Sequence, residues 1–418
     1  MFRLLALSLG ALCLSCHGAA PGPSPLPAPS GAQREGPAAS RVHLAALPAS
    51  PAADGGAGGQ AINEKPGHPI CPPPPVASTS PTDDYLDASE RAFDARNYAL
   101  ALACSEEALV DDPEGPAPLH ERAVDLAALG RLDEAKLAYA HALAVDPDDP
   151  QILLDAADLY LSHGGEREDD EIALEYARRG ERRARRRHAE LLEQLELLEG
   201  MALDDLGRSS EALPKLEEAL SRDPKDMDAH YERGSALFEL CRFAEAKDEL
   251  SRVLAALPDD AYAHHELGLT LERLDDPRGA ARELARASEL SPKDFPPSIA
   301  VSPDEFAEMV KAAIERLPPD ARADLAGTPV GVQDLPDVED LTVDDPPLSP
   351  TILGLFRGDP LEPDAGNEQR AIVLYRQNLL RAVRTKAELE KQVTITLLHE
   401  LGHLRGADDD ELRLEGLE

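Results

Sequence analysis

The feature that most constrains the fold of this chain is a proline that returns every 34 residues through its middle part. Pro113 and Pro147 are 34 residues apart, and Pro224, Pro258 and Pro292 repeat the same interval. A fixed period of this length indicates that one supersecondary unit is copied along the chain, and that each copy buries its apolar face against the next. We therefore expect a stacked array of repeats.

Small side chains recur at two fixed distances before these prolines. Such positions allow the two antiparallel helices of one unit to touch closely. Twelve residues before each proline stands an alanine, and twenty-four before it stands a serine, alanine or glycine: Ala101, Ala135, Ala212, Ala246 and Ala280, and Ser89, Ala123, Gly200, Gly234 and Gly268. The pattern resembles the tetratricopeptide repeat, although the tryptophan of that consensus is missing.

One unit of the array is longer than the others. The interval that ends at Pro224 is 77 residues, which is two periods and nine residues. We expect an extended unit there, with Ala157 and Tyr160 on its first helix and Ala173 on a lengthened second helix. About six units then span residues 82–295 as an α-solenoid, whose concave side would receive a peptide of a substrate or partner protein.

The extended unit holds an arginine-rich segment. Its arginines are Arg178, Arg179, Arg182, Arg183, Arg185, Arg186 and Arg187. One interpretation is a solvated helix face paired with its own acids, because Glu175 stands four residues before Arg179 and Glu181 four before Arg185. The other is a docking patch for an acidic protein segment, a lipid head group or a wall polymer. The sequence leaves both open.

The overall charge bears on the partners of the chain. The 418 residues carry 80 acidic and 42 basic side chains, a formal net charge of −38. Such a balance argues against binding to nucleic acid, which depends on neutralising phosphates, and favours basic partners. The chain has no tryptophan and is rich in helix-forming residues, which favours a mainly α fold.

The N-terminus is typical of an exported protein. Residues 1–16 combine one positive charge, a short apolar run and small residues, as a signal peptide does. Leu14-Ser15-Cys16 resembles a bacterial lipobox, which implies a lipid on Cys16 and membrane attachment without a transmembrane helix in the mature chain. Cleavage near Gly18 without lipidation is the alternative, because Cys13 stands where the motif usually has leucine. We expect a protein of the bacterial cell envelope, periplasmic or associated with the outer membrane.

Residues 17–80 are dominated by Pro, Ala, Gly and Ser, which predicts a disordered tether. Beyond the signal peptide stand Cys71, Cys104 and Cys241, and this scattered spacing indicates neither a disulfide framework nor a metal motif. We expect Cys104 and Cys241 to be small buried residues of helices and Cys71 to be exposed in the tether.

A different motif stands near the C-terminus, in the run His399-Glu400-Leu-Gly-His403. Histidines four residues apart lie one turn apart on a helix, so they can present two imidazole nitrogens to one zinc ion, with Glu400 as general base. A helix is predicted because Val393, Leu397, Leu398, Leu401 and Leu404 recur at spacings of three and four.

Gly406 should end that helix, since glycine adopts the left-handed conformation of a sharp turn. The turn would bring Asp409 back towards the histidines as a third metal ligand; Asp408, Asp410 and Glu411 are possible substitutes. The competing interpretation is a solvated helix end followed by an acidic tail.

The residues before this motif form a separate domain over residues 300–418. Ser302 and Pro303 predict the start of a helix that runs to Pro318. Three short strands are expected at 338–343, 352–356 and 371–375, which together with the motif helix make a small α+β domain.

This domain resembles the minimal-zincin metallopeptidase family of bacteria. The matching runs are 344–347, 352–361, 372–376 and, most specifically, 393–409 with its H-E-x-x-H-x-x-G-x-x-D pattern. The resemblance implies that His399, His403 and Asp409 bind zinc and that Glu400 is the catalytic base. Tyr375 and Arg376 are candidates for stabilising the oxyanion, or are structural residues of a strand.

Two functions from different classes follow from these features. The first is an exported zinc metallopeptidase, a hydrolase whose repeats recruit a protein substrate or partner; hydrolysis of a non-peptide amide would use the same chemistry. The second is a cell-envelope scaffold that acts through its repeats and carries an inactive or structural zincin-like domain.

Overall fold

The computed structural model describes residues 69–75, 79–163, 167–358, 370–414 and 416–417, and the backbone of residues 5–7. The predicted cleavage and lipidation sites at Gly18 and Cys16, and most of the predicted tether, lie outside these residues. The chain divides into two compact units: an N-terminal unit of Ala39–Ala202 and Ser221–Pro224, and a C-terminal unit that includes Leu203–Leu220 and Lys225–Glu418. Each is described by itself.

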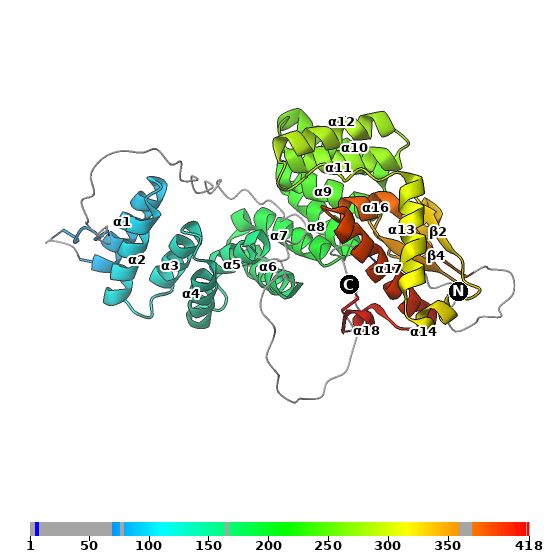
Figure 1. Cartoon of the computed structure of the whole chain (residues 1–418). Coiled ribbons are helices and arrows are strands. Elements are labelled where there is room, and N and C mark those ends of the chain that lie inside the picture. The colour runs from blue at the N-terminus through cyan, green and yellow to red at the C-terminus, as the bar shows by residue number, and fades with distance from the viewer. Residues whose placement is uncertain are drawn as a thin grey trace, which may run out of the picture. The chain divides into compact units, whose positions relative to one another are not determined.

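Twelve helices in the described residues carry the repeats (Figure 1). They alternate as first and second helices of successive pairs, and within each of the pairs α1/α2, α3/α4, α5/α6, α9/α10 and α11/α12 the two helices pack on each other. The first helices are α1 (Pro81–Asp94), α3 (Pro116–Ala128), α5 (Pro150–His163), α7 (Leu192–Asp205), α9 (Met227–Glu239) and α11 (Ala261–Arg273). The second helices are α2 (Tyr98–Asp111), α4 (Leu132–Val145), α6 (Arg167–Arg187), α8 (Ser209–Arg222), α10 (Phe243–Ala256) and α12 (Pro277–Leu290).

The small residues lie where the sequence predicts close helix contacts. All five alanines before the prolines are buried, with at most 1% of their surface exposed. A Cβ atom on Gly268 would lie 2.6 Å from Cγ of Leu284, and one on Gly234 would lie 3.0 Å from Cγ of Leu250. The prediction of a mainly α chain of stacked helix pairs is confirmed.

The extended unit is the pair α5/α6, in which α6 has 21 residues. Its arginines pair with acids of this and neighbouring segments: Arg178 Nε lies 2.9 Å from Glu199 Oε1 of α7, Arg183 Nη2 lies 2.7 Å from Asp148 Oδ2 before α5, and Arg185 contacts Glu181 of α6 itself. Arg179 contacts Asp148 as well, whereas Glu175 contacts Arg182. These contacts favour the interpretation as a paired helix face over that as a docking patch.

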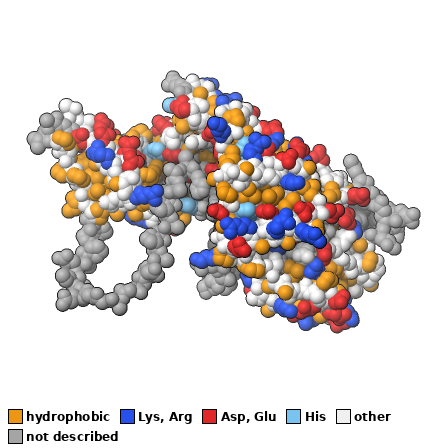
Figure 2. Space-filling model, turned by 90° about the horizontal axis from the view of Figure 1, so that it is seen from above, with side chains coloured by type: hydrophobic (Ala, Val, Ile, Leu, Met, Phe, Trp, Pro, Cys, Tyr) orange, Lys and Arg blue, Asp and Glu red, His pale blue; other side chains and the backbone are white. Residues whose placement is uncertain are grey.

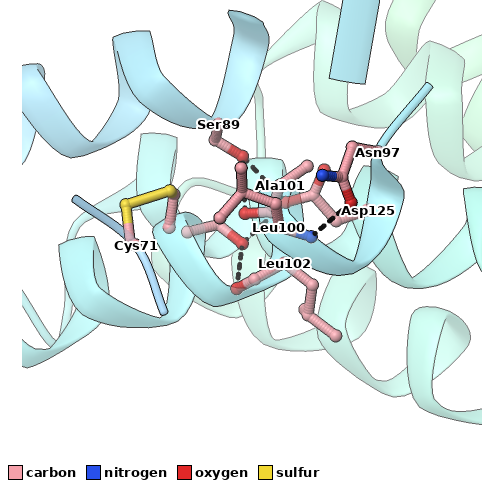
Figure 3. Close-up of a disulfide and its surroundings, with 9 residues drawn as sticks. Cys71, Ser89, Asn97, Leu100, Ala101, Leu102 and Asp125 are labelled. Atoms are coloured by element: carbon pink, nitrogen blue, oxygen red, sulfur yellow. Dashed lines mark hydrogen bonds between the residues drawn. A yellow bond between two sulfur atoms is a disulfide. The ribbon is translucent and has the colours of Figure 1, made fainter. Parts of the chain in front are cut away.

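The cysteine predictions are wrong at Cys71. Cys71 is 5% exposed and forms a disulfide with Cys104 of α2, so the predicted tether is attached to the first repeat at this residue (Figure 3). The two cysteines are 33 residues apart, one in a proline-rich segment and one in a helix. Such a pair has no spacing signal, and only the packing of the segment brings them together. Cys241 is half-buried in the turn between α9 and α10 rather than inside a helix.

The C-terminal unit continues after α12 into a small α+β domain (Figure 1). Its helices are α13 (Pro303–Arg316), α14 (Pro319–Asp324), α15 (Val338–Leu341), α16 (Arg376–Arg381), α17 (Lys386–Arg405) and α18 (Asp409–Leu414). The strands β2 (Val330–Gln333), β3 (Gly354–Arg357) and β4 (Ala371–Tyr375) form a sheet in which β4 is parallel to β2 and antiparallel to β3. Backbone pairing of β1 (Leu5–Leu7) with β3 extends the sheet order to β1-β3-β4-β2.

Two of the three predicted strands are present, and one is wrong. The strand at 371–375 is confirmed, and β3 lies within one residue of the predicted end of the strand at 352–356. Residues 338–341 form the helix α15 instead, because Asp337 stands at its N-cap position and Glu339 and Asp340 in its first turn suit a helix start. The short strand β2, whose central residues are exposed, had no apolar alternation to reveal it.

The motif helix α17 packs on the sheet through β3 and β4, and α13, α14 and α16 also contact it. Phe306 of α13, Phe356 of β3, Leu374 of β4 and Leu397 of α17 are fully buried in the shared core. The predicted start of α13 is confirmed, since Ser302 accepts a hydrogen bond from the Glu305 amide at 3.2 Å.

The α+β domain is also joined to the last repeats within the C-terminal unit. Arg381 of α16 donates to both carboxylate oxygens of Glu272 in α11, at 2.5 and 2.6 Å. Arg273 donates to the Pro336 carbonyl at 2.6 Å, and Cys241 packs beside Leu348. Because these contacts include a half-buried ion pair and apolar packing, the final helix pairs and the α+β domain form one folded body.

The surface of the chain carries charges of both signs. Acidic and basic side chains are intermixed over the face seen in Figure 2. No helix within the described residues combines the length and the apolar character needed to cross a membrane.

Candidate metal centre

The helix α17 is held at both ends by local signals in the sequence. At its start, Thr385 and Glu388 form a capping box, in which each side chain accepts a hydrogen bond from the backbone of the other. At its end, Gly406 has a φ of 93°, the left-handed conformation that stops the helix. The predicted helix and its end at Gly406 are confirmed.

The structure brings His399, His403 and Asp409 together. The two Nε2 atoms are 2.8 Å apart. Asp409 Oδ1 lies 3.4 Å from Nε2 of His399 and 3.3 Å from Nε2 of His403. His403 is fully buried and His399 is 5% exposed. Three ligand atoms thus converge on one point, each within 4.8 Å of the others.

Asp409 reaches the histidines because α18 folds back on α17. Leu412 of α18 is 1% exposed and packs over Gly402 so closely that a Cβ there would lie 2.2 Å from Leu412 Cδ2. The neighbouring acids Asp408 and Glu411 are engaged with each other's backbone amides, at 2.9 and 3.3 Å, and so begin α18. Of the described acids in this segment, Asp409 is therefore the one that faces the histidines.

The outer nitrogens of both histidines are close to backbone carbonyls. Nδ1 of His399 lies 2.6 Å from the Leu417 carbonyl, and Nδ1 of His403 lies 3.0 Å from the Ala407 carbonyl. A carbonyl only accepts, so each Nδ1 carries the hydrogen and each Nε2 presents a lone pair. Sequence reasoning did not find these two carbonyl contacts, because a backbone acceptor has no signature in the residue type.

Two imidazole lone pairs and a carboxylate oxygen therefore face one another in a buried space. Asp409 Oδ1 is buried and has no hydrogen-bond partner among the described residues. The charge of Asp409 suits this place: burial would raise its pKa, but the two histidines outweigh that effect and hold the pKa well below its ordinary value. Such a donor set fits zinc, which binds two histidines and a carboxylate in catalytic sites.

Glu400 lies on the same helix, between the two histidines in sequence. Its side chain is fully buried, and neither carboxylate oxygen has a hydrogen-bond partner of normal geometry among the described residues. Burial raises the pKa of Glu400 well above its ordinary value, the Phe356 amide lowers it in part, and the charge of Asp409 raises it further. Gly354 of β3 leaves room for it, because a Cβ there would lie 2.9 Å from Glu400 Oε1.

Tyr375 and Arg376, the two candidates for stabilising the oxyanion, contact residues of the protein core and its backbone. Arg376 is 8% exposed, lies 2.7 Å from Asp334 Oδ1 and donates to the Val301 carbonyl at 3.1 Å. Tyr375 is fully buried in a small cluster with Leu341 and Ile352, and burial raises its pKa. Neither residue is among the three that converge on the candidate metal centre.

Comparisons with known families agree with this geometry. Residues 325–417 match the model of the zincin-like metallopeptidase family. Residues 205–268 match a tetratricopeptide-repeat model. No curated protein matches the sequence.

Several solved structures resemble the repeat region. YrrB, described as a tetratricopeptide-repeat protein with an unusual peptide-binding site, is 22% identical, covers 45% of this chain and 93% of its own, and has a TM-score of 0.36. The type IV pilus biogenesis factor PilW is 16% identical over 52% of this chain and 96% of its own, with a TM-score of 0.45. A thermophilic tetratricopeptide-repeat protein of Thermus thermophilus is 21% identical over 46% of this chain and 99% of its own, with a TM-score of 0.36.

Both family resemblances seen in the sequence are thereby confirmed. The chain carries a zincin-like metallopeptidase domain at residues 325–417 and, upstream of it, tetratricopeptide repeats.

Proposed function

We propose that the protein is a zinc-dependent metallopeptidase whose repeats recruit a protein substrate or partner. The observation that supports this most is the convergence of His399, His403 and Asp409 within 4.8 Å, beside the buried and unpartnered carboxylate of Glu400. A purely structural helix end gives no reason to bury a carboxylate without a partner, since an unpaired buried charge is costly.

Each residue has a separate task in this proposal. His399, His403 and Asp409 hold the metal, and the carbonyls of Leu417 and Ala407 fix the orientation of the two imidazoles. A zinc ion held there would polarise the peptide carbonyl and lower the pKa of a water molecule towards about 7. Glu400 would accept the proton that the water loses as its oxygen attacks the carbonyl carbon, and would return that proton to the amine nitrogen as the C–N bond breaks.

The proposal extends to the compartment. A signal peptide over residues 1–16 would export the chain, and lipidation of Cys16 would hold it at the bacterial cell envelope. The disulfide between Cys71 and Cys104 supports export, because disulfides persist mainly in oxidising compartments. The repeats would then act outside the cytoplasm on a protein or peptide of the envelope.

The proposal is tested by metal content and turnover together, on the full chain. We expect about one zinc per chain in the wild type and none in His399→Ala. His141→Ala, which removes an exposed histidine of α4, is the matched control and should keep the metal. Glu400→Gln should keep zinc and lose at least about 100-fold in the cleavage rate of a quenched fluorescent peptide library.

Three results would contradict the proposal. A wild-type chain that stays free of metal after zinc is supplied would show that the three residues are not ligands. A zinc-loaded wild type that cleaves no peptide, or a Glu400→Gln variant that cleaves at the wild-type rate, would remove the catalytic assignment. The first two of these results would leave the scaffold function, carried by the repeats, as the better explanation.

A further inference from the structure

The first helices of the last repeats carry carboxylates that repeat with the 34-residue period. Glu232 of α9 and Glu266 of α11 both stand 26 residues before the proline of their repeats, Pro258 and Pro292. Equivalent positions of successive repeats stack beside each other in a solenoid. The two glutamates therefore belong to one row that runs across the repeats.

Two more acids, Asp204 at the end of α7 and Glu239 at the end of α9, act electrostatically on this row. Burial raises the pKa of Glu232 most, followed by the charges of Asp205 and Asp204, and Glu266 adds to the shift. Burial also raises the pKa of Glu266 most, followed by the charges of Glu239 and Asp204. We call Asp204, Glu232, Glu239 and Glu266 the acidic cluster. All four belong to the C-terminal unit.

No cation of the described residues balances the acidic cluster. None of its four members forms an ion pair with a described Lys or Arg. Asp204 accepts a hydrogen bond from the hydroxyl of Ser235 at 3.1 Å, and Ser209 and Ser235 both oppose the rise in its pKa that burial causes. Glu232 is 3% exposed, and its Oε1 has no hydrogen-bond partner among the described residues. The buried Oδ1 of Asp204 also has no hydrogen-bond partner among them.

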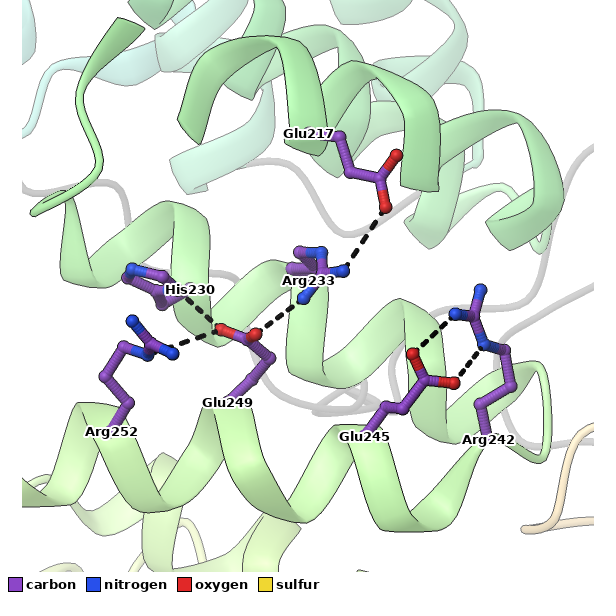
Figure 4. A network of polar contacts seen from close by, with 7 residues as sticks. All are labelled: Glu217, His230, Arg233, Arg242, Glu245, Glu249 and Arg252. Atoms are coloured by element: carbon purple, nitrogen blue, oxygen red, sulfur yellow. Dashed lines mark hydrogen bonds and ion pairs between the residues drawn. The ribbon is translucent and has the colours of Figure 1, made fainter. Parts of the chain in front are cut away.

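A neighbouring carboxylate on α10 shows the contrast. Glu249 Oε2 lies 2.5 Å from Nδ1 of His230, and Glu249 Oε1 accepts a hydrogen bond from Arg233 of α9 at 2.5 Å (Figure 4). Glu249 thus has a guanidinium partner, whereas no described Lys or Arg forms an ion pair with a member of the acidic cluster.

The burial of the acidic cluster makes ionisation of its carboxylates unfavourable. Burial raises the pKa of Glu239 to about 7 and that of Glu266 to about 8, with the neighbouring carboxylates adding to the shift. Buried carboxylates in such a group are costly when ionised and unpaired. A cation that entered the cluster would remove this cost, so the cluster favours a positively charged ligand.

The ligand atoms are not arranged for a bare metal ion. The groups of described residues whose ligand atoms converge within 4.8 Å do not include any member of the acidic cluster. A guanidinium group fits better, because its five N–H donors are spread over a plane and can bridge carboxylates from several helices. Asp204, Glu239 and Glu266 are each partly exposed as whole residues, although burial dominates the environment of their carboxylates.

We propose that the acidic cluster is the binding site for an arginine side chain of the polypeptide that the repeats recruit. The site lies on the first helices, and α9 and α11 contact each other directly, as expected on the inner side of a curved stack. This inference rests on the proposed function and adds to it the chemistry of the substrate or partner: an extended segment that contains a basic residue.

The position of the cluster supports a link to the catalytic domain. Ser349 lies close enough to Glu239 to oppose the rise in its pKa. Ser349 stands in the loop that leads into β3, and β3 contacts Glu400 at Gly354. A segment anchored at the acidic cluster is therefore held beside the loop that enters the sheet of the zincin-like domain.

The test measures binding separately from cleavage. The full chain carrying Glu400→Gln is titrated into a fluorescein-labelled peptide, Gly-Ser-Ala-Arg-Ala-Arg-Ala-Ser-Gly, and anisotropy is recorded. The same peptide with citrulline in place of both arginines removes the charge and keeps the shape. We expect the arginine peptide to bind at least 10-fold more tightly than the citrulline peptide.

Adding Glu232→Gln and Glu266→Gln should weaken binding of the arginine peptide at least 10-fold. Glutamine reproduces the shape of a neutral carboxyl group, so the repeats should stay folded, which far-ultraviolet circular dichroism would check. The matched control is Asp248→Asn with Glu289→Gln, which removes the same charge from exposed positions of α10 and α12 and should change binding less than 2-fold.

The outcomes separate this inference from the proposed function. Equal binding of the arginine and citrulline peptides, or equal weakening by the control pair, would overturn the arginine site. So would a calcium or zinc ion that alone competes with the peptide at the cluster. Each of these results leaves the zinc content of the metal centre and its cleavage activity untouched, since both are measured without the labelled peptide.

Discussion

Asp125 is a buried carboxylate in the first repeats. Asp125 of α3 is 1% exposed and lies within hydrogen-bond distance of the hydroxyls of Ser89 and Ser105, at 3.0 and 2.7 Å (Figure 3). Burial raises the pKa of Asp125 to about 7, and the two hydroxyls only partly oppose this. Asp125 thus connects α1, α2 and α3, and its raised pKa makes the free energy of unfolding depend on pH.

We expect Asp125→Asn to remove this pH dependence. A raised carboxyl pKa stabilises the folded state at low pH, and that stability is lost as pH rises from about 4 to about 7. The asparagine side chain does not ionise, so the variant should match the wild type at pH 4 and exceed it at pH 8 by on the order of 1–3 kcal/mol. Urea unfolding midpoints at both pH values measure this.

The control for this change is Asp133→Asn, an exposed acid on α4. It should leave the difference between pH 4 and pH 8 unchanged. A variant Asp125→Asn that is less stable than the wild type at pH 8 would show that the ionised form of Asp125 is favoured by the fold.

Among the elements, the pair α17 and α18 decides whether the metal centre can form. α17 supplies both histidines and Glu400, whereas α18 begins with Asp409 and returns over Gly402. The return depends on the absence of a side chain at position 402, because Leu412 fills that space. The geometry of the site therefore depends on the packing of two helices as well as on its ligand residues.

We expect Gly402→Ala to weaken zinc binding by about 10-fold, the lower range for changes near metal ligands. A loss of zinc affinity would be informative, because helix propensity alone predicts the opposite effect on α17. Alanine stabilises a helix relative to glycine by about 1 kcal/mol. The added methyl group would displace Leu412 and move Asp409 away from the histidines. Competition with a zinc chelator measures the dissociation constant.

A second change distinguishes displacement from other effects of this substitution. Leu412→Ala in the Gly402→Ala background restores the space and should recover most of the lost zinc affinity. If the double variant binds zinc no better than Gly402→Ala alone, the contact between α18 and α17 is not what positions Asp409.

For the molecule as a whole, the important feature is that the last repeats and the zincin-like domain belong to one compact unit. Glu272 and Arg381 are each 19% exposed and form the ion pair between α11 and α16. Arg273 adds a hydrogen bond to the Pro336 carbonyl. A peptide held by the repeats would thus be presented to a zincin-like domain that belongs to the same compact unit as α9–α12.

We expect Glu272→Ala and Arg381→Ala each to loosen this junction. A half-buried pair of this kind contributes about 1–2 kcal/mol, and removal of either partner leaves the other without compensation. Hydrogen exchange of backbone amides in α11 and α16 should become about 5–30-fold faster where it reports opening of the junction. The double variant should add little to either single change.

Arg316→Ala is the control, because its pair with Glu390 lies on the surface, with Arg316 65% exposed. It should leave exchange in α11 and α16 unchanged. Unaltered exchange in Glu272→Ala would mean that the junction is held by its apolar contacts, such as Cys241 with Leu348.

The sequence by itself determined the features that depend on local spacing. The period of the prolines and small residues predicted the helix pairs, since these positions need small side chains wherever two helices touch. Gly406 and the histidines at positions 399 and 403 predicted the end of α17 and the two imidazoles on one face, because helix geometry is the same in every protein.

Only the tertiary structure decided the features that join distant segments. The disulfide of Cys71, the helix at 338–341, the strand β2 and the carbonyl of Leu417 beside His399 have no periodic signature. The same is true of the acidic cluster, because nothing in the sequence distinguishes its four members from the other acids among the 80. Burial and neighbours give these residues their properties, and both arise only when the chain has folded.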